Sequence, residues 1–490
     1  MRDRSYVKQY PTCGSYLLKK GKTHGSMNSI GGLFMSYLDY VNEHKKSMIE
    51  ALMKLVEIPS VLSAYDESSD TPFGKPIDDA LKTMLEMAEE DGFVALNVDN
   101  HAAHIEWGEG KEVLGILTHL DVVPAKGAWT RPPFEPYLKD GKIYGRGTMD
   151  DKGPTIAAYF AMKLLRASGF TPKKRIRLIL GLDEETANRG IERYFSKEPM
   201  PDAGFSPDAE FPVIHGEKGL FSFDFEGKAM PGSLLHFHSG ERYNVVPAKA
   251  TAVIEDSLDL SESFNQYLKS HGLKGNVQGN TYVLEGKSAH ASTPEKGVNG
   301  AVHLALFLSE HIDHPYINLI ANVFAFDHYG ELTGIASNDD LLEALTLNPA
   351  VFRYSKEGAL IGLNVRYPYS FDIEKAHHTL SKLAYKYHLK YKSKGRVSPH
   401  YVDSDDSLVT TLMEAYKHVT SDYDNPPFTI GGGTYARTLE KGVAFGLVMP
   451  GREDVAHQID EHIFIDDFLK ATAIYMEAIE NLTNTENTLK

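Results

Sequence analysis

The stretch that decides the fold lies at residues 115–150 and reads GILTHLDVVPAKGAWTRPPFEPYLKDGKIYGRGTMD. It starts within an apolar run at 113–117, which is typical of a buried strand and leads into His119-Leu120-Asp121. It ends at Asp150, which Asp151 follows just before a helix that we expect to open at Pro154. Imidazole and carboxylate groups at a strand end, with paired carboxylates before a helix, indicate a site for a divalent metal.

A second apolar run, 176–182, predicts another buried strand, and Asp183-Glu184-Glu185 follows it directly. In extended geometry Glu184 and Glu185 point to opposite sides of the chain. One of them can therefore bind metal while the other faces a metal-activated water as a general base. Asp121 lies two residues after His119, and there it suits the role of holding the imidazole in one tautomer.

Two metal ions a few ångströms apart need a shared carboxylate and further ligands for each ion. Each candidate also has a simpler interpretation. A His-x-Asp pair is common in loops, Asp150 and Asp151 could cap the following helix, and Asp208 lies in a Pro-rich turn-forming segment. The combination favours the metal site, because the pieces around 119, 150 and 183 each end a buried strand or begin a helix. The candidate ligands are His119, Asp150, Glu185, Asp208 and His457.

The composition bounds the class of protein. A chain of 490 residues exceeds one ordinary core, so we expect two domains. Asp plus Glu is 67 and Lys plus Arg is 51, and the net charge of −16 argues against a nucleic-acid or anionic-membrane partner. No apolar run reaches the roughly 20 residues that span a bilayer. Cys13 is the single cysteine, which excludes an intrachain disulfide and favours the cytoplasm, with secretion left open.

The texture of the sequence changes twice along the chain. Residues 1–34 have no sustained period, and we interpret them as an extension that is disordered or not native to the folded protein. Alternating helix and strand patterns at 35–218 and again at 397–490 predict one discontinuous α/β domain, a mixed sheet flanked by helices. Alternating phenylalanines begin an inserted α+β lid domain, 219–396. Three of the predicted elements are a helix at 37–57, a strand at 443–449 and a last helix at 465–482.

These motifs together resemble the co-catalytic two-metal metallopeptidases, the family of glutamate carboxypeptidase, aminoacylase and succinyl-diaminopimelate desuccinylase. The likeness rests on His119-Leu120-Asp121, on GRGTMDDKG at 145–153 and on Asp183-Glu184-Glu185, and it extends over 37–482. The resemblance implies that the carboxylate of Asp150 bridges two metals. It also implies that the peptide bond between Asp150 and Asp151 is cis. It also implies the remaining roles: His119, Glu185, Asp208 and His457 as ligands, Glu184 as general base and Asp121 as orienting carboxylate.

Within this family the chain resembles the bacterial dipeptidase V group, which includes Xaa-His dipeptidases similar to carnosinase. The long insertion matches the enlarged lid that replaces a partner subunit in that group and implies a monomer. RYNVVP at 242–247 and SAHAS at 288–292 are similar to its lid motifs and imply Asn244 and His290 as ligands of the substrate or its oxyanion. NVRYP at 364–368 and GGTYAR at 432–437 are similar to its substrate-binding segments.

The residues themselves support these lid assignments with less force. The guanidinium fork of Arg366 suits the terminal carboxylate of a peptide, and Gly432 and Gly433 permit close approach of the backbone to a ligand. The simpler alternatives are that Arg366 pairs with a surface acid and that the glycines only turn the chain. A histidine such as His290, taken alone, is more often a structural residue with satisfied hydrogen bonds than a donor to an oxyanion.

The expected function is that of a metal-dependent dipeptidase that hydrolyses short unblocked peptides. Glu184 would take a proton from the metal-activated water, His290 would hold the oxyanion, and Arg366 would hold the product carboxylate. Zinc is the expected metal, with manganese or cobalt as alternatives. Two other functions stay open: an N-acyl amino-acid deacylase or desuccinylase of the same family, and a non-catalytic metal- or peptide-binding protein. The complete ligand set and Glu184 disfavour the non-catalytic alternative.

Overall fold

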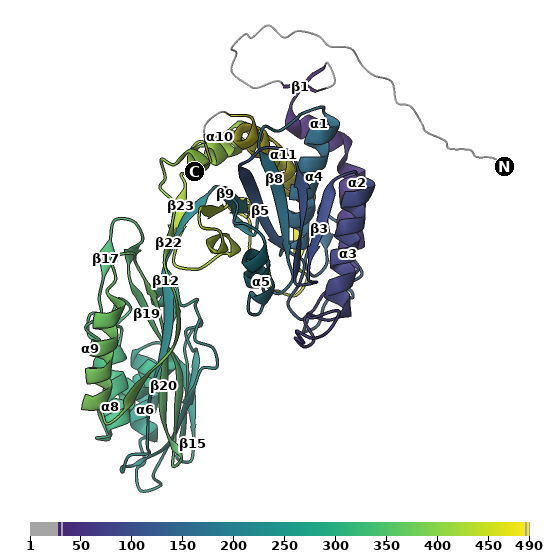
Figure 1. Cartoon of the computed structure of the whole chain (residues 1–490). Helices are drawn as coiled ribbons and strands as arrows, with labels where there is room; N and C mark the ends of the chain where they lie inside the picture. The colour runs from purple at the N-terminus through teal and green to yellow at the C-terminus, as the bar shows by residue number, and fades with distance from the viewer. Residues whose placement is uncertain (1–27, 31–32, 486–487, 490) are drawn as a thin grey trace, which may run out of the picture.

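The computed structural model describes residues 28–30, 33–485 and 488–489. It has two parts, a larger one with helices around a sheet and a smaller one with helices along one side of a second sheet (Figure 1). Cys13 and most of the extension expected at 1–34 lie outside the described residues. Within that extension, β1 (Asn28–Ile30) pairs antiparallel with β2 (Leu33–Met35).

The sheet of the larger part is built around β5 (Val113–His119), every residue of which is buried. It lies between β8 (Arg175–Gly181) and β9 (Ala203–Ser206) and runs parallel to both, whereas β4 (Ala102–Trp107) pairs antiparallel with β8 and with β3 (Val94–Val98). The mixed sheet expected from the sequence is therefore confirmed. Among the described residues the order is β22 (His400–Tyr401), β11 (Ile214–Glu217), β24 (Gly442–Ala444), β9, β5, β8, β4 (Ala102–Trp107) and β3 (Val94–Val98), with β23 (Phe428–Ile430) beside β11.

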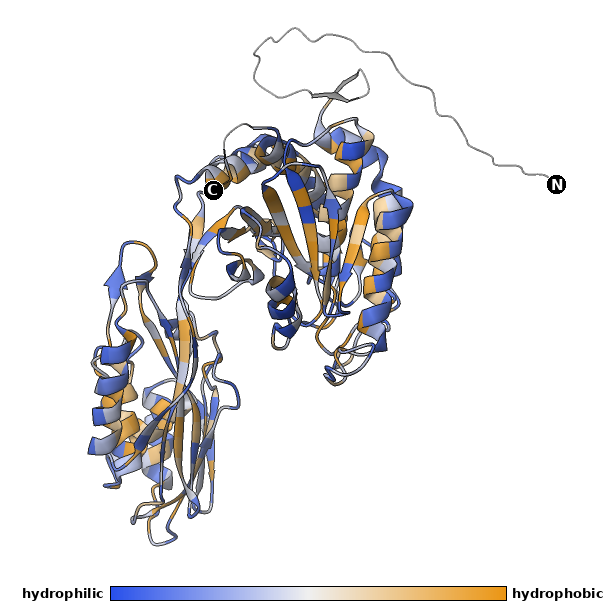
Figure 2. Cartoon of the chain, viewed as in Figure 1, coloured by the Kyte–Doolittle hydropathy of each residue, from blue (hydrophilic) through white to orange (hydrophobic). Residues whose placement is uncertain are grey.

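Helices cover both faces of this sheet, and their apolar sides turn toward it (Figure 2). Ile191 and Tyr194 of α5 (Arg189–Lys197) pack on one face together with Tyr435. Both faces are buried, and the two parallel strands are accordingly mostly apolar, with Thr118 and His119 at the end of β5 and Arg175 and Arg177 in β8 as the exceptions. The opposite face carries α2 (Lys45–Val56), α3 (Lys75–Glu90), α4 (Lys152–Ala167), α10 (Ser407–Thr420) and α11 (Ile465–Asn484).

Two elements differ from the sequence expectation. The helix expected at 37–57 is split at His44 into α1 (Tyr37–Glu43) and α2. The prediction of a single strand at 443–449 is wrong. Gly446 has a φ of +85°, and the chain turns there, so the segment forms two short strands. The first is β24 of the main sheet, and the second, β25 (Leu447–Val448), pairs with β10 (Ala209–Glu210).

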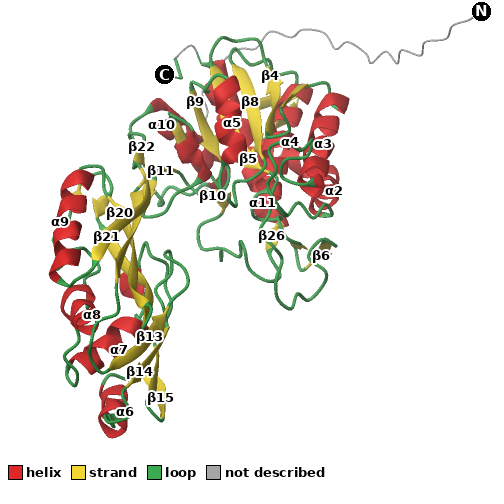
Figure 3. Cartoon of the chain, turned by 60° about the horizontal axis from the view of Figure 1, so that its bottom comes forward, coloured by secondary structure: helices red, strands yellow, loops and turns green. Residues whose placement is uncertain are grey.

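The second sheet is antiparallel throughout, and its helices lie along one face (Figure 3). Phe221, Phe223 and Phe225 point into the core on that side, whereas the alternate positions, such as Asn364 and Arg366, lie on the other face. Its order is β15 (Lys274–Gln278), β16 (Thr281–Glu285), β14 (Lys249–Ile254), β13 (Leu234–Ser239), β19 (Thr346–Ser355), β20 (Gly358–Tyr367), β12 (Gly219–Gly227) and β21 (Lys390–Val397), and its helices are α6 (Ser261–Ser270), α7 (Gly300–Ser309), α8 (Pro315–Leu319) and α9 (Ile373–Lys386).

The chain crosses between the two sheets at two places. It leaves β11 and enters β12 through Lys218, and it returns from β21 to β22 through Ser398 and Pro399. We keep 35–218 with 397–490 and 219–396 as the proposed division into catalytic and lid domains. Smaller elements are β6 (Tyr137–Lys139), β7 (Lys142–Tyr144) and β26 (His462–Phe464), which form a three-stranded sheet, and β17 (Asn338–Asp339) paired with β18 (Glu343–Ala344).

Candidate active site

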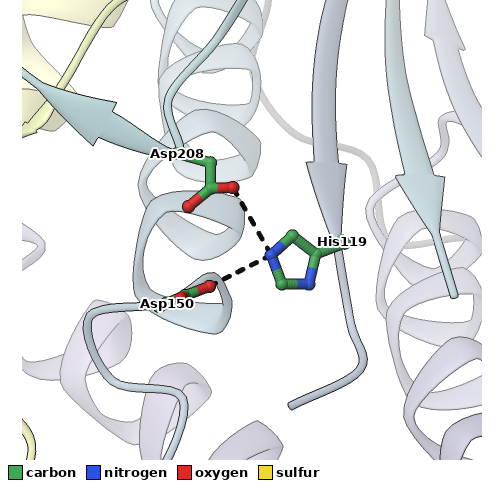
Figure 4. Close-up of side chains that lie close together, drawn as sticks. All are labelled: His119, Asp150 and Asp208. Carbon is green, nitrogen blue, oxygen red and sulfur yellow. Dashed lines mark ion pairs between the residues drawn. The ribbon is translucent and has the colours of Figure 1, made fainter. Parts of the chain in front are cut away.

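His119, Asp150 and Asp208 meet at the end of the parallel strands (Figure 4). His119 is the last residue of β5, Asp150 precedes α4, and Asp208 lies between β9 and β10. The Nε2 atom of His119 lies 3.1 Å from Oδ1 of Asp150 and 3.5 Å from Oδ2 of Asp208. Three segments far apart in the sequence thus direct one nitrogen and two carboxylates at a common point.

A second group forms on the other oxygen of Asp150. The Nε2 atom of His457 lies 2.9 Å from Oδ2 of Asp150 and 2.8 Å from Oε1 of Glu185. In each group the candidate ligand atoms lie within 4.8 Å of one another. The five candidate ligands therefore divide into two sets of three that share Asp150, which is the arrangement a pair of bridged cations requires.

The chemistry of these donors fits divalent cations. Both Nε2 of His119 and Oδ1 of Asp150 are buried, and neither has a hydrogen-bond partner among the described residues. Buried polar atoms without partners are costly, so such a pair indicates that another species belongs between them. A mixed set of imidazole nitrogens and carboxylate oxygens suits zinc and also accepts manganese or cobalt.

The electrostatics of the site also call for positive charge. Hydrogen bonds to Asp150 and Glu185 raise the pKa of His457 to about 10. Burial opposes protonation of His119, but Asp121, Asp150 and Asp208 together hold its pKa well above the usual range. Without metal the two imidazoles therefore bind protons, and a metal ion would replace those protons as the counter-charge.

Glu184 belongs to neither ligand group, although it lines the same cavity as Glu185. Burial raises its pKa to about 8, an effect that His119 opposes and Asp208 reinforces. A carboxylate in this range can both accept and release a proton near neutral pH. Of the adjacent pair, Glu185 therefore contributes an atom to a ligand group, whereas Glu184 does not.

Asp121 lies behind His119 and holds two parts of the site. Its backbone carbonyl accepts a hydrogen bond from Nδ1 of His119 at 3.0 Å, and its Oδ1 lies 3.3 Å from the same nitrogen. Its carboxylate also accepts the backbone N–H groups of Glu184 and Glu185, each at 3.2 Å. Asp121 therefore fixes the imidazole of His119 with Nε2 directed into the site. It also fixes the backbone of Glu184 and Glu185.

Glu461 is a supporting residue to which the sequence analysis gave no role. It is fully buried and accepts the backbone N–H groups of Gly147, Met149 and Asp150 at 2.9–3.2 Å. The guanidinium of Arg146 pairs with it at 2.6 Å. Its position four residues after His457 is the one signal in the sequence. The segment before Asp150 is thereby held rigidly, and the peptide bond between Asp150 and Asp151 is cis.

A cavity of about 500 Å³ lies over both ligand groups, and the lid contributes to its wall. His290, from the lid, lines it together with Gly433 and the carboxylates of Asp150, Glu184, Glu185 and Asp208. Here the lid touches the glycine segment, residues 431–434. A Cβ atom on Gly431 would lie 2.9 Å from the Ser292 side chain. His290 and the rest of the cavity wall therefore come from the same chain.

The protonation of His290 follows from its neighbours. Its Nδ1 accepts the backbone N–H of Ser292 at 3.4 Å and lies 2.7 Å from the Ser292 hydroxyl. Burial and the charge of Arg366 lower the pKa of His290, so the ring is neutral at pH 7. With Nδ1 as acceptor, the proton is on Nε2, which is available as a hydrogen-bond donor.

Three expected substrate-binding residues are not part of the cavity wall. Asn244 is exposed, and its carbonyl accepts the N–H of Ala291. Arg366 is 5% exposed and donates from Nη1 to the Gly431 carbonyl at 2.7 Å and from Nε to Asn364. A Cβ on Gly432 would lie 3.9 Å from Nη1 of Arg366. Among the described residues Arg366 has no salt bridge with an acid, so the surface-pair alternative does not describe it.

Comparison with known proteins identifies the family. The model of Peptidase family M20/M25/M40 matches residues 115–481. The chain belongs to this family. It is accordingly a peptide hydrolase from a family of dinuclear metal-dependent enzymes.

Relatives with high sequence identity carry dipeptidase names. A protein of Staphylococcus haemolyticus named "Putative dipeptidase" is 42% identical over 90% of this chain and 98% of its own length. One of the same name from Staphylococcus aureus is 42% identical over the same shares. Human carnosine dipeptidase 1 has the same fold, with a TM-score of 0.57 at 15% identity over 92% of this chain and 98% of that one. No helix in the described part of the chain is long and apolar enough to span a bilayer.

Proposed function

We propose that the protein is a metal-dependent dipeptidase acting on short peptides with a free amino terminus. The observation that carries the proposal is the pair of ligand groups that share Asp150, with Glu184 beside them and the lid residue His290 in the same cavity. The dipeptidase names of relatives that match this chain over nearly their whole length support the substrate class.

In this proposal His119, Asp150, Glu185, Asp208 and His457 hold two divalent cations. Such ions lower the pKa of a water molecule and polarise the scissile carbonyl. Glu184 accepts the proton of the attacking water and passes it to the leaving nitrogen, a role that its position in the cavity outside both ligand groups suits. The Nε2–H of His290 donates a hydrogen bond to the oxygen on which negative charge develops.

The substrate-binding roles of Asn244, Arg366, Gly432 and Gly433 are part of the same proposal. Burial, and after it the charge of Arg437, lowers the pKa of Arg366, and the second positive charge favours an anion nearby. A peptide's terminal carboxylate is the anion that this chemistry suits. Asn244 and the outer part of the lid would reach the substrate only when the lid moves toward the cavity.

The assembly and location are also proposals. Because His290 of the same chain lines the cavity, one chain supplies both the metal ligands and the lid histidine, and we infer a monomer. A chain whose single cysteine is Cys13 needs no oxidising compartment, which supports the cytoplasm.

The test is a matched substrate set assayed with added zinc, manganese or cobalt. It contains a free dipeptide, the same dipeptide N-acetylated, a tripeptide and an N-acyl amino acid. We expect cleavage of the free dipeptide at a kcat/KM well above that of the other three. Preference for the acylated compounds would instead assign the protein to the deacylases, which use the same metal chemistry. No turnover of any substrate with any of the metals would overturn the proposal.

A further inference from the structure

One guanidinium contacts both of the strands that connect the catalytic part to the lid. Arg437 donates from Nη2 to the carbonyl of Lys218 at 3.1 Å and to the carbonyl of Ser398 at 2.9 Å. Lys218 joins β11 to β12, and Ser398 lies between β21 and β22. Because these are the two crossings between the sheets, Arg437 binds the backbone at both of the points where the lid joins the catalytic part.

The same arginine is tied to the wall of the active-site cavity. Its Nε lies 3.4 Å from Oε2 of Glu217, a carboxylate that is 1% exposed. Glu217 also accepts the backbone N–H of Thr434 at 3.0 Å and the Thr434 hydroxyl. Thr434 lines the cavity, so the residues at the crossings and the residues of the cavity wall form one connected network.

The glycine segment 431–434 is held from two sides. Arg366 of the lid donates to the Gly431 carbonyl at 2.7 Å, and Glu217 holds Thr434 at the other end. Tyr435 follows at once and packs its ring edge-on against the imidazole of His119, with centroids 5.9 Å apart. A displacement of this segment would therefore reach a proposed metal ligand as well as the substrate.

We propose that Arg437 is a positioning residue that couples the orientation of the lid to the placement of the glycine segment in the cavity wall. A planar fork suits this task, because it can bind two carbonyls and one carboxylate at fixed angles, which a lysine ammonium on a flexible stem does not. Gly433 leaves room for it, since a Cβ there would overlap Nη1 of Arg437. The kinetic consequence rests on the proposed function, but the structural consequence does not.

The first measurement is the distance between lid and catalytic domain in the full chain. Two spin labels would report this distance. They are attached to the cysteines introduced by Glu89→Cys in α3 and Lys382→Cys in α9, both at exposed positions, and Cys13→Ser removes the native cysteine. We expect Arg437→Ala to broaden the distance distribution or shift its mean. Arg437→Lys serves if the alanine variant does not fold, and it should broaden the distribution less.

Arg175→Ala is the matched control. Arg175 also donates to two backbone carbonyls, those of Gly110 and Lys111, and faces the carboxylate of Glu106, but it lies at the start of β8, away from the crossings. It should lower the melting temperature without changing the distance distribution. This separates loss of an arginine's packing from loss of the coupling.

The second measurement is dipeptide hydrolysis by the metal-loaded enzyme. We expect Arg437→Ala to lower kcat by roughly tenfold to a hundredfold with unchanged metal content, because misplacement by an ångström is enough for such a loss. Added methylguanidinium should restore part of kcat in Arg437→Ala and none in Arg175→Ala. An Arg437→Ala protein with the wild-type distance distribution would overturn the inference. A wild type inactive on every peptide would overturn the proposed function, and the distance measurement would still decide this one.

Discussion

The polar side chains of the two sheets differ in the charge of their neighbours. On the polar face of the lid sheet, unlike groups meet: Asp224 binds the Tyr243 hydroxyl and pairs with Lys394, and Asn364 binds Arg366. At the ends of the catalytic strands, carboxylates face one another around His119 and His457. The lid face is largely complete within the chain, whereas the catalytic end needs cations from outside it.

This difference indicates what each part contributes to the proposed function. The catalytic sheet supplies fixed ligands, because its parallel strands end at one edge and are buried on both faces. The lid supplies a donor, His290, through a loop, and its contribution depends on how the lid is held. Changes at the catalytic end should act on chemistry or on metal, whereas changes in the lid should act on rate or substrate binding and leave the metal content unchanged.

The largest effect should come from Glu184→Ala. We expect kcat to fall roughly 10²- to 10⁴-fold, the range for loss of a general base, while metal content measured by mass spectrometry stays that of the wild type. The reason is that Glu184 lies in neither ligand group. His457→Ala is the control, and it should lose bound metal. Turnover near the wild-type rate would remove Glu184 from the role of base.

A smaller effect should follow from His290→Ala in the lid. Loss of one oxyanion donor should lower kcat roughly 10²- to 10³-fold with little change in KM or metal content. Ser292→Ala removes one of the two contacts that fix the ring tautomer, so its effect should be milder. Loss of metal from the His290 variant would contradict the separation of lid and ligand residues.

The smallest effect concerns the pH dependence of metal binding. In the metal-free protein the pKa of His457 is raised to about 10, so below that pH the imidazole must release a proton before Nε2 can bind metal. The apparent affinity for zinc should therefore rise with pH between 6 and 9, by about tenfold per pH unit for each proton released. Calorimetry in buffers of different ionisation enthalpy counts the protons released when zinc binds. An affinity independent of pH would show that the site binds no protons in competition with metal.

Much of the catalytic half could be predicted from local sequence. His119 and Asp183 lie at the ends of apolar runs that predict buried strands, and Asp150 precedes a helix that begins at Lys152, two residues before the expected start at Pro154. The cover of helices on the sheet then follows from the general rules of α/β sheets. The supporting residue Glu461 could not be found in this way, because its three backbone partners lie more than three hundred residues earlier in the chain.

The last strand shows the same limit on a smaller scale. An apolar run at 443–449 predicts one strand, but the conformation of Gly446 divides it, and the second piece pairs beside Asp208. Hydrophobic pattern sets what is buried and does not set where a chain turns. Likewise, no pattern around Arg437 could indicate that its guanidinium reaches both crossings to the lid.

The sequence by itself determined the kinds of groups in the site and the elements that carry them, because strand and helix signals are local and the ligand residues sit at their ends. Only the tertiary structure decided that Asp150 faces both His119 and His457, and that His290 joins the same cavity. Those relations depend on distances between segments hundreds of residues apart. They are set by the packing of two sheets and the strands between them, which no local pattern encodes.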